Sequence, residues 1–497
     1  MTKPQRRTLQ KRPSAATAPL LQAAVIGILL VALGLVCFHV KTSVRDPDLW
    51  LHLKAGDWIA HHHAVPFADS FSRIAKGRSW LAYSWLPELS LYAAYRALGV
   101  VGIGYYGTLL TLGVACAVLW MAWRLSGRFL ASCVLAALAC WAFLFNSMPR
   151  PVFLSMIFFS ITLAILLLAD RSGRVQLLYW LPLVFLLWSN SHVQFIYGLG
   201  VLGLFLAVTA GERVALRFGL LPSLCEPSKL PIGRVAAVLV ACFVATLIGP
   251  YTFHLYTKVY DYSKAKVIYS LVLELQALSF RYPRNFVQLA LTAAAFVAVG
   301  WNKKVDLFKL ALLTVCTVIA YRAIRDSWFV TLATVACIAD SWVKQSEAEE
   351  RKPAPRIALG LAAALVCLMG LAPTFGFDRT GLTATVASAF PVQAADFVRQ
   401  QQLPGPIYNA FGWGGFLIWY LPEYPVVIDG RTDLYGDDMV ELFTKTAWAV
   451  SYAQDPYLND ARVILVERSI PLVKFLSEDP RYELLYKDKI AAVFRRR

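Results

Sequence analysis

The stretch Arg45-Asp46-Pro47-Asp48-Leu49-Trp50-Leu51-His52 places two carboxylates one residue apart, shortly after the first long apolar run of the chain. Pro47 fixes one backbone φ angle between them, so the two acids are held in a defined relation. Asp48 is also a good helix N-cap, and a solvated turn that starts a helix over 48–60 would explain the pair without any function. A carboxylate beside a bilayer can instead take a proton from an acceptor hydroxyl or amide, or hold a divalent cation.

The composition is that of a membrane protein. Of 497 residues, 58% are apolar and only 16% are charged, whereas a soluble globular chain is about half apolar and a quarter charged. The net charge of +17 comes from lysines and arginines that stand in short clusters between the apolar runs. This distribution indicates contact with membrane lipids and excludes a nucleic-acid partner. The nine cysteines show neither a disulfide framework nor metal-ligand spacing.

The apolar runs predict a polytopic α-helical protein with about 11 transmembrane helices. The expected spans are 20–40, 100–123, 129–145, 151–169, 175–189, 193–210, 235–250, 286–301, 306–321, 327–343 and 357–373. The basic segment 1–19 precedes the first span, which we interpret as an uncleaved anchor that enters from the cytoplasm. In this multi-pass arrangement in the cell membrane, the loops 41–98 and 251–285 and the C-terminus are on the outer face.

The composition changes at about 374, and residues 374–497 are expected to form a small extracytoplasmic α/β domain. Its predicted strands are Pro406–Phe411, Val426–Asp429 and Val463–Glu467, and its predicted helices are Asp438–Val450 and Ile470–Leu476. A hairpin is expected over Glu483–Arg495, turning at Lys487-Asp488-Lys489. A further short helix, Pro87–Leu98, is predicted in the first outer loop.

Other candidate site residues lie at the outer ends of the expected spans. Glu274 is an isolated carboxylate among leucines and valines, so it is either paired and perturbed or an interfacial residue. Arg322 and Arg325 suit a phosphate, because a guanidinium donates two hydrogen bonds at once, or they anchor the span at the interface. Arg150 and His192 lie at other outer ends and are candidates for the same pocket.

Two stretches of the tail are rich in glycine. They are Gly412-Trp413-Gly414-Gly415-Phe416 and Asp429-Gly430-Arg431. Glycine permits unusual backbone angles and close approach, but the spacing is not that of a dinucleotide-binding loop. Aromatic and glycine residues next to Asp-Gly-Arg fit either a surface that recognises a peptide or sugar, or a tight turn.

Together these features resemble the GT-C superfamily of integral-membrane glycosyltransferases, which includes oligosaccharyltransferases and protein mannosyltransferases. The run Asp46-Pro47-Asp48-Leu49-Trp50 is similar to the Asp-Pro-aromatic stretch in the first loop of oligosaccharyltransferase catalytic subunits. The glycine-rich tail resembles their Trp-Trp-Asp-Tyr-Gly motif in spacing, with Gly414 or Gly415 near the place of its central Asp. The chain is also similar to bacterial membrane proteins of unassigned function that carry D-P-D-L-W and I-D-G-R-x-D-L-Y stretches.

The resemblance implies transfer of a sugar from a polyprenyl-phosphate or pyrophosphate carrier to a glycan, lipid or protein acceptor on the outer face. It gives each candidate residue a role: Asp46 as base or metal ligand with Asp48 as its partner, Glu274 as second acid, Arg322, Arg325, Arg150 and His192 at the donor phosphate, and Trp413, Asp429 and Arg431 at the acceptor. If a divalent cation such as Mg²⁺ or Mn²⁺ is used, Asp46 and Glu274 are its expected ligands. The alternatives are a lipid-linked glycan ligase or polymerase of another fold, and a transporter or flippase, which would show paired halves and mid-membrane charges.

Overall fold

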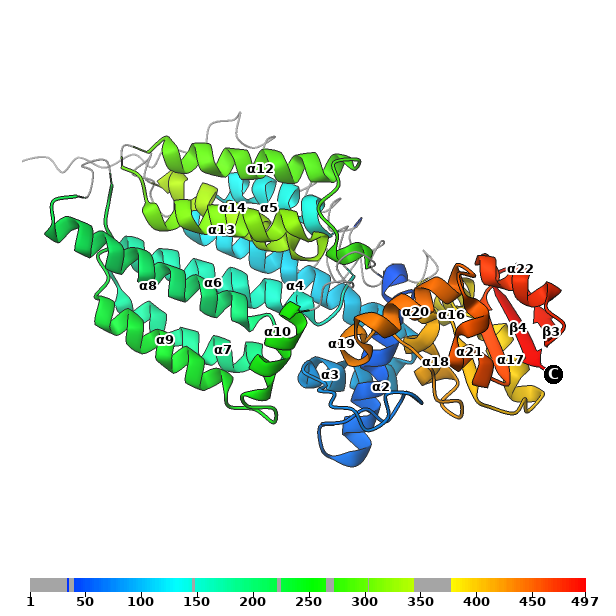
Figure 1. Ribbon diagram of the computed structural model, residues 1–497. Coiled ribbons are helices and arrows are strands. Elements are labelled where there is room, and N and C mark those ends of the chain that lie inside the picture. Colours follow the sequence, from blue (N-terminus) through cyan, green and yellow to red (C-terminus); the bar gives the residue numbers. More distant parts are fainter. Residues whose placement is uncertain are drawn as a thin grey trace, which may run out of the picture.

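The structure is a computed structural model that describes residues 34, 40–144, 148–220, 225–264, 272–302, 304–343 and 377–497. It is mostly helical, with a bundle of long helices and a C-terminal part that contains a small sheet (Figure 1). Two helices of the first loop, α2 and α3, lie between these parts (Figure 1). The first-loop helices are α2 Pro47–His62 and α3 Trp85–Leu98.

The bundle is built from helices whose bounds agree closely with the expected spans. They are α4 Val100–Ser126, α5 Phe129–Phe143, α6 Val152–Ser172, η2 Val175–Trp180, α7 Leu181–Ser189, α8 Phe195–Arg217, α9 Ile232–Thr246, α10 His254–Lys264, η3 Leu273–Leu275, α12 Pro283–Gly300, α13 Leu307–Arg322, η4 Ile324–Asp326 and α14 Ser327–Val343. Within the described part, α4, α6 and α8 are long and apolar enough to cross a membrane. The expected spans 20–40 and 357–373 and the basic tail 1–19 lie outside the described residues, apart from residues 34 and 40.

The connection 251–285 contains a helix that the sequence analysis did not predict. Helix α10 runs along the ends of α8 and α9, where Tyr256 packs on Phe195 and Phe243 with ring centroids 5.5 Å apart in both pairs. Leu255 of the same helix is 4% exposed. The helix is therefore amphipathic, and its apolar side is covered by the bundle.

The C-terminal part packs helices around a four-stranded mixed sheet with strand order β1-β2-β4-β3. The strands are β1 Ile407–Asn409, β2 Val463–Glu467, β3 Tyr482–Lys487 and β4 Ala491–Arg496. Strands β1 and β2 are parallel, and β4 is antiparallel to both β2 and β3. The other elements are α16 Arg379–Ala389, α17 Val392–Gln400, η6 Phe411–Trp413, α18 Gly414–Tyr420, α19 Thr432–Tyr435, α20 Asp437–Ala447, η7 Tyr452–Gln454, α21 Pro456–Asp460 and α22 Pro471–Glu478. The predicted strand over 463–467, the hairpin and the helices near 438–450 and 470–476 are all present.

The predicted strand Val426–Asp429 is wrong. This segment makes only an isolated bridge between Val426 and Ser72 of the first loop. The side chain of Asn409 replaces the hydrogen bonds of a neighbouring strand: its amide nitrogen donates to Ile428 O at 2.8 Å, and its oxygen accepts from Val427 N at 2.8 Å. A buried backbone is thus satisfied without joining the sheet.

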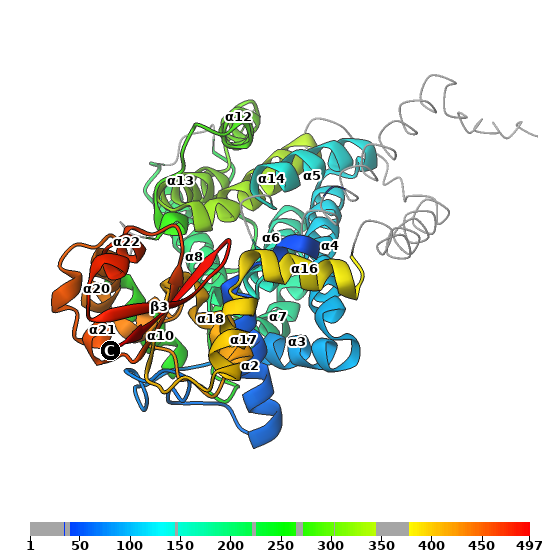
Figure 2. The same ribbon diagram turned by 90° about the vertical axis from the view of Figure 1, so that its right-hand side faces the viewer.

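Helix α2 begins one residue before the predicted start at 48, and its N-cap is Asp46 rather than the expected Asp48. The carboxylate of Asp46 accepts a hydrogen bond from Asp48 N at 3.1 Å, and Pro47 occupies the first turn. The apolar side chains of α2 are buried on more than one side, because α3 covers one side and α18 of the C-terminal part covers another (Figures 1 and 2). The first loop and the C-terminal part therefore share a hydrophobic core, to which Ile59 and Trp80 contribute from the loop.

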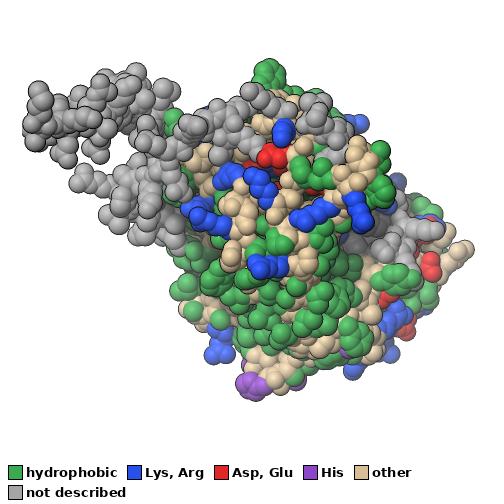
Figure 3. All heavy atoms as spheres, turned by 90° about the vertical axis from the view of Figure 1, so that its left-hand side faces the viewer, with side chains coloured by type: hydrophobic (Ala, Val, Ile, Leu, Met, Phe, Trp, Pro, Cys, Tyr) green, Lys and Arg blue, Asp and Glu red, His purple; other side chains and the backbone are tan. Residues whose placement is uncertain are grey.

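The two ends of the bundle differ in charge. Lysine and arginine side chains gather at the end that faces away from the C-terminal part (Figure 3). The exposed basic residues in the connections at this end are Arg124, Arg128, Arg174, Arg213, Arg217, Lys229, Arg234 and Lys304. The opposite end carries the connections that hold the candidate site residues.

Candidate active site

Three carboxylates surround the guanidinium of Arg150. Its Nε and Nη2 atoms donate to the two carboxylate oxygens of Asp46, at 2.5 and 2.8 Å. Its Nη1 atom lies 2.9 Å from Asp48 Oδ2 and 3.4 Å from Glu274 Oε2. The structure thus brings together four of the residues that the sequence analysis singled out, from three separate connections of the chain.

We define the acid cluster as Asp46, Asp48, Glu274 and Arg150, and its members come from three places in the chain, at or near the ends of helical elements. The two aspartates belong to the N-cap and first turn of α2, Arg150 precedes α6, and Glu274 lies in η3. Helix ends leave backbone groups and side chains free to face one another, whereas residues inside a helix are committed to its packing.

The three acids differ in exposure and in electrostatics. Asp46 is 1% exposed and Asp48 is 28% exposed, while Glu274 is 44% exposed. Burial, together with the charges of Asp46 and Glu274, raises the pKa of Asp48 above its usual value, although Arg150 acts in the opposite direction. Burial alone would lower the pKa of Arg150, but the three carboxylates outweigh it and raise that pKa. The cation therefore stays charged, and Asp48 holds a proton more readily than an ordinary aspartate does.

His192 lies within electrostatic reach of Arg325 and of His52 in helix α2. Burial and the charge of Arg325 lower the pKa of His192 to about 3, so the imidazole is neutral at ordinary pH. Its Nδ1 atom is 2.9 Å from Ser155 Oγ, which also accepts a hydrogen bond from Trp188 Nε1 at 2.8 Å. His192 is thus held in one orientation.

A backbone hydrogen bond connects the segment that carries Arg322 and Arg325 to the segment that carries Glu274. In η4, Ile324 N donates to Gln276 O at 2.9 Å, directly after the η3 turn that carries Glu274. Arg325 follows Ile324, and Arg322 is exposed at the end of α13. Both arginines therefore lie at the same end of the bundle as the acids.

His52 and Glu88 belong to the site but were missed by the sequence analysis. His52 Nδ1 lies 2.8 Å from Glu88 Oε1 of α3, and Glu88 is 3% exposed. When protonated, His52 lowers the pKa of Asp48, which stands one helical turn before it. The i, i+4 spacing of Asp48 and His52 on a predicted helix was the signal that could have found this residue.

The glycines of the tail allow the C-terminal part to touch the acid pair. A Cβ atom on Gly430 would lie 2.2 Å from Asp48 Oδ1, and one on Gly415 would lie 2.3 Å from Pro47 O. A Cβ atom on Gly414 would lie 2.1 Å from Ile428 O, in the segment that leads to Gly430. Only glycine permits this approach, so the two glycine-rich stretches form the wall behind Asp48.

Asp429 and Arg431, expected at the acceptor, are buried and bonded to each other. Arg431 donates to both oxygens of Asp429, at 2.8 and 2.7 Å, and to Asp69 Oδ1 of the first loop at 2.5 Å. The guanidinium carbon lies 4.7 Å from the ring centroid of Trp80. We call these three charged residues the Asp69–Arg431–Asp429 clasp; it joins the C-terminal part to the first loop.

The acid cluster does not fit a divalent cation. A metal held by Asp46 and Glu274 would have to share the space between their oxygens with the guanidinium of Arg150, which already contacts both. Among the described residues, no group of three or more His, Cys, Asp or Glu side chains is placed to hold a metal ion. The positive charge at this site is supplied by the chain itself.

Comparisons with known proteins give one informative match. No family model and no curated protein matches the chain. The oligosaccharyltransferase AglB from Archaeoglobus fulgidus, solved with an inhibitory peptide and a dolichol-phosphate, superposes with a TM-score of 0.54 at 10% identity, covering 92% of this chain and 70% of AglB. ArnT from Cupriavidus metallidurans bound to undecaprenyl phosphate gives a TM-score of 0.42 at 14% identity, covering 97% and 98% of the two chains. The AglB superposition shows that this chain, whose described part contains three helices long and apolar enough to cross a membrane, shares the fold of that oligosaccharyltransferase.

Proposed function

We propose that this protein is a membrane glycosyltransferase that moves a sugar from a polyprenyl-phosphate-linked donor to an acceptor on the outer face of the cell membrane. The observation that carries the proposal is the acid cluster around Arg150, which lies between the bundle and the C-terminal part. AglB, which has the same fold, was solved with a dolichol-phosphate.

The geometry favours Asp48, rather than Asp46, as the general base. Asp46 is nearly inaccessible, and both of its oxygens are bonded to Arg150. Asp48 is more exposed, and its raised pKa brings it closer to that of the group it must accept a proton from. In this assignment Asp46 fixes the position of the Arg150 guanidinium through two hydrogen bonds, and Arg150 in turn positions the carboxylate of Asp48.

The proposed reaction is a single displacement at the anomeric carbon of the donor sugar. Asp48 takes the proton of the acceptor hydroxyl or amide while the acceptor atom forms its bond to the anomeric carbon. The bond from that carbon to the phosphate oxygen breaks, and the phosphate leaves with the electron pair. One displacement inverts the configuration at the anomeric carbon.

The phosphate that leaves requires positive charge in reach. The charge of Arg150 is already balanced by three carboxylates, so we assign the donor phosphate to Arg322 and Arg325 instead. The imidazole of His192 is neutral, so it adds no positive charge for the phosphate. Its bond to Ser155 fixes the orientation of the ring.

The orientation in the membrane follows from the charge of the two bundle ends. Connections rich in arginine and lysine are retained on the cytoplasmic side. The basic end shown in Figure 3 then faces the cytoplasm, and the acid cluster and the domain 374–497 face outward. The N-terminal segment 1–19 is cytoplasmic in this arrangement.

The test uses the full-length protein in lipid nanodiscs with a radiolabelled polyprenyl-phosphate sugar and membrane extract as the source of acceptor. We expect Asp48→Asn to abolish transfer at every pH. The matched control is Asp57→Asn, which removes an acid of the same helix that pairs with Lys54 at 2.9 Å and lies outside the acid cluster. Wild-type transfer should fall as pH drops through the pKa of Asp48, at a higher pH than an ordinary aspartate would give, because protonation removes the base.

The roles of the two aspartates are separated by the same assay. Asp46→Asn should lower the rate of transfer without abolishing it, and the remaining transfer should still decrease at low pH. Absence of transfer by the wild-type protein would reject the proposed function. Full activity in Asp48→Asn would reject Asp48 as the base, and a normal rate in Asp46→Asn would reject the supporting role of Asp46.

A further inference from the structure

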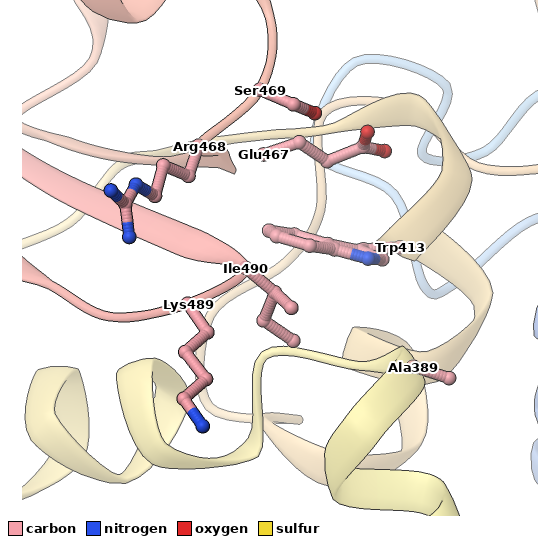
Figure 4. A pocket seen from close by; sticks show the side chains of 7 residues that line it. All are labelled: Ala389, Trp413, Glu467, Arg468, Ser469, Lys489 and Ile490. Atoms are coloured by element: carbon pink, nitrogen blue, oxygen red, sulfur yellow. The ribbon is translucent and has the colours of Figure 1, made fainter.

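The C-terminal part contains an open cavity of about 460 Å³ that lies apart from the acid cluster (Figure 4). This volume is within the range of small-molecule sites, about 300–1,000 Å³. The walls come from the end of α16, from η6, from the connection between β2 and α22, and from the β3–β4 turn.

One end of the cavity combines an aromatic ring with hydrogen-bonding groups. The indole of Trp413 forms an apolar wall, and Glu467 and Ser469 lie on the same side of the cavity (Figure 4). Glu467 is partly buried, and within the described residues its carboxylate makes no side-chain hydrogen bond or ion pair. Trp413 is 5% exposed, so it closes the wall, while the carboxylate of Glu467 and the hydroxyl of Ser469 can accept hydrogen bonds from a polar ligand.

Two basic side chains also line the cavity. Arg468 and Lys489 extend away from Glu467, in different directions (Figure 4). The guanidinium of Arg468 is held to the hairpin by a 2.9 Å hydrogen bond from Nη1 to Asp488 O, and Lys489 is exposed. The ammonium of Lys489 is therefore the cation that is accessible to an anionic group of a ligand.

The cavity adjoins the acid pair through two short pieces of chain. Trp413 stands two residues before Gly415, whose backbone touches Pro47. Ala389, on another wall, follows Ser388, which accepts a hydrogen bond from Arg45 Nη2 at 3.3 Å. A ligand in the cavity would therefore lie beside the segment that carries Asp46 and Asp48.

We propose that this cavity binds an anionic saccharide of the acceptor, with hydroxyl groups of the sugar beside Glu467 and Ser469 and the acidic group at Lys489. This proposal rests on the proposed function and names the class of acceptor that the enzyme takes. A saccharide fits better than an acidic peptide, because every sugar ring also offers hydroxyl groups that can donate to Glu467, whereas the side chains of an acidic peptide offer carboxylates alone.

Binding is measured without turnover, by isothermal titration calorimetry on the full-length Asp48→Asn protein in nanodiscs. The probes are tetrasaccharides of hyaluronan and of polygalacturonate, with chitotetraose as the neutral control. We expect the anionic probes to bind at least tenfold more tightly than chitotetraose. Lys489→Gln should weaken their binding about tenfold, as expected for the loss of one charge-assisted hydrogen bond.

The matched control is Lys487→Gln, which removes the same charge from the same hairpin at an exposed position outside the cavity. Equal binding of anionic and neutral probes, or no binding of either anionic probe, would overturn the proposal. So would an equal loss in the Lys487→Gln protein, or a tetraglutamate peptide that binds as tightly as the saccharides.

The two proposals fail in different ways. If the anionic probes bind as expected but the wild-type protein transfers no sugar, the proposed function is rejected and the cavity remains a saccharide site. If transfer requires Asp48 but the probes do not bind, the function stands and the acceptor assignment falls. In the active enzyme, Lys489→Gln should raise KM for an anionic acceptor and leave kcat unchanged.

Discussion

At the scale of single residues, Arg150 decides how the site is charged. Its planar fork reaches both oxygens of Asp46 and one oxygen each of Asp48 and Glu274. Three carboxylates this close together would repel one another strongly without a cation between them. Arg150 therefore does what a divalent cation would do for such acids, with a charge that is part of the chain.

This assignment predicts a glycosyltransferase that needs Arg150 and needs no added metal. Chelation of divalent cations with EDTA should leave wild-type transfer unchanged. Arg150→Ala should lower transfer about 100- to 1,000-fold, the usual cost of removing a preorganised electrostatic group, and added guanidinium should restore part of it. The rates are measured with the labelled-donor assay.

The control is Arg96→Ala, because Arg96 is an exposed arginine on α3 outside the acid cluster. Arg150→Lys should be only partly active, since an ammonium cannot bond three carboxylates in one plane. Loss of wild-type activity in EDTA, with recovery on adding Mg²⁺ or Mn²⁺, would contradict the role given to Arg150.

At the scale of elements, the first turn of α2 is fixed from both sides. Arg150 holds its acids from the bundle, and the glycine-rich stretches of the C-terminal part touch Pro47 and Asp48 from the opposite side. Helix α3 also lies very close, because a Cβ atom on Gly56 of α2 would lie 2.1 Å from Glu88 O. The position of Asp48 therefore depends on the whole of this packing.

Gly430→Ala tests this dependence. The new methyl group would lie 2.2 Å from Asp48 Oδ1, so the carboxylate has to move. A displacement of about 1 Å at a catalytic group can cost 100-fold in rate, and we expect kcat to fall about 10- to 100-fold with little change in unfolding temperature. Gly412→Ala is the matched control, because its methyl group would meet nothing nearer than Glu467 Oε1 at 3.5 Å. Equal rates in the two variants would show that the glycine at 430 does not position Asp48.

At the scale of the whole molecule, the sequence predicted the helices and strands better than the contacts between them. Apolar runs predicted the bundle helices to within a few residues, because burial in lipid or protein requires long apolar segments. The strand predicted at 426–429 failed, because the amide of Asn409 satisfies Val427 and Ile428. A pattern of β-branched residues cannot reveal that the side chain of Asn409 supplies the hydrogen bonds that a neighbouring strand would otherwise make.

The candidate site was predicted in part for a related reason. Hydropathy and loop charge assigned Asp46, Glu274 and Arg150 to the same end of the bundle. The pairing of Arg150 with Asp46 spans 104 residues and depends on how the helices pack, which no local pattern records. The sequence also suggested that Asp429 and Arg431 face an acceptor, whereas they are buried in the clasp that joins two parts of the chain.

The clasp leads to a prediction about the molecule as a whole. Arg431 is 5% exposed, and its loss would leave Asp69 and Asp429 buried without their cation. Removing one partner of a buried ion pair costs about 3–5 kcal/mol, so Arg431→Met should lower the unfolding temperature of the C-terminal part markedly. The comparison is the ion pair of Asp479 with Arg481, which is 41% exposed, since pairs with a solvent-exposed cation contribute about 0–1 kcal/mol.

Both variants are examined in nanodiscs by thermal unfolding, limited proteolysis and the transfer assay. Because Gly430 stands between Asp429 and Arg431, opening the clasp withdraws the wall behind Asp48. Arg431→Met should therefore lose transfer at temperatures where the bundle is still folded, and Arg481→Met should lose neither stability nor transfer. If Arg431→Met unfolds at the wild-type temperature and keeps its rate, the C-terminal part is held to the first loop by the shared hydrophobic core alone, and the buried charges contribute nothing to the position of the base.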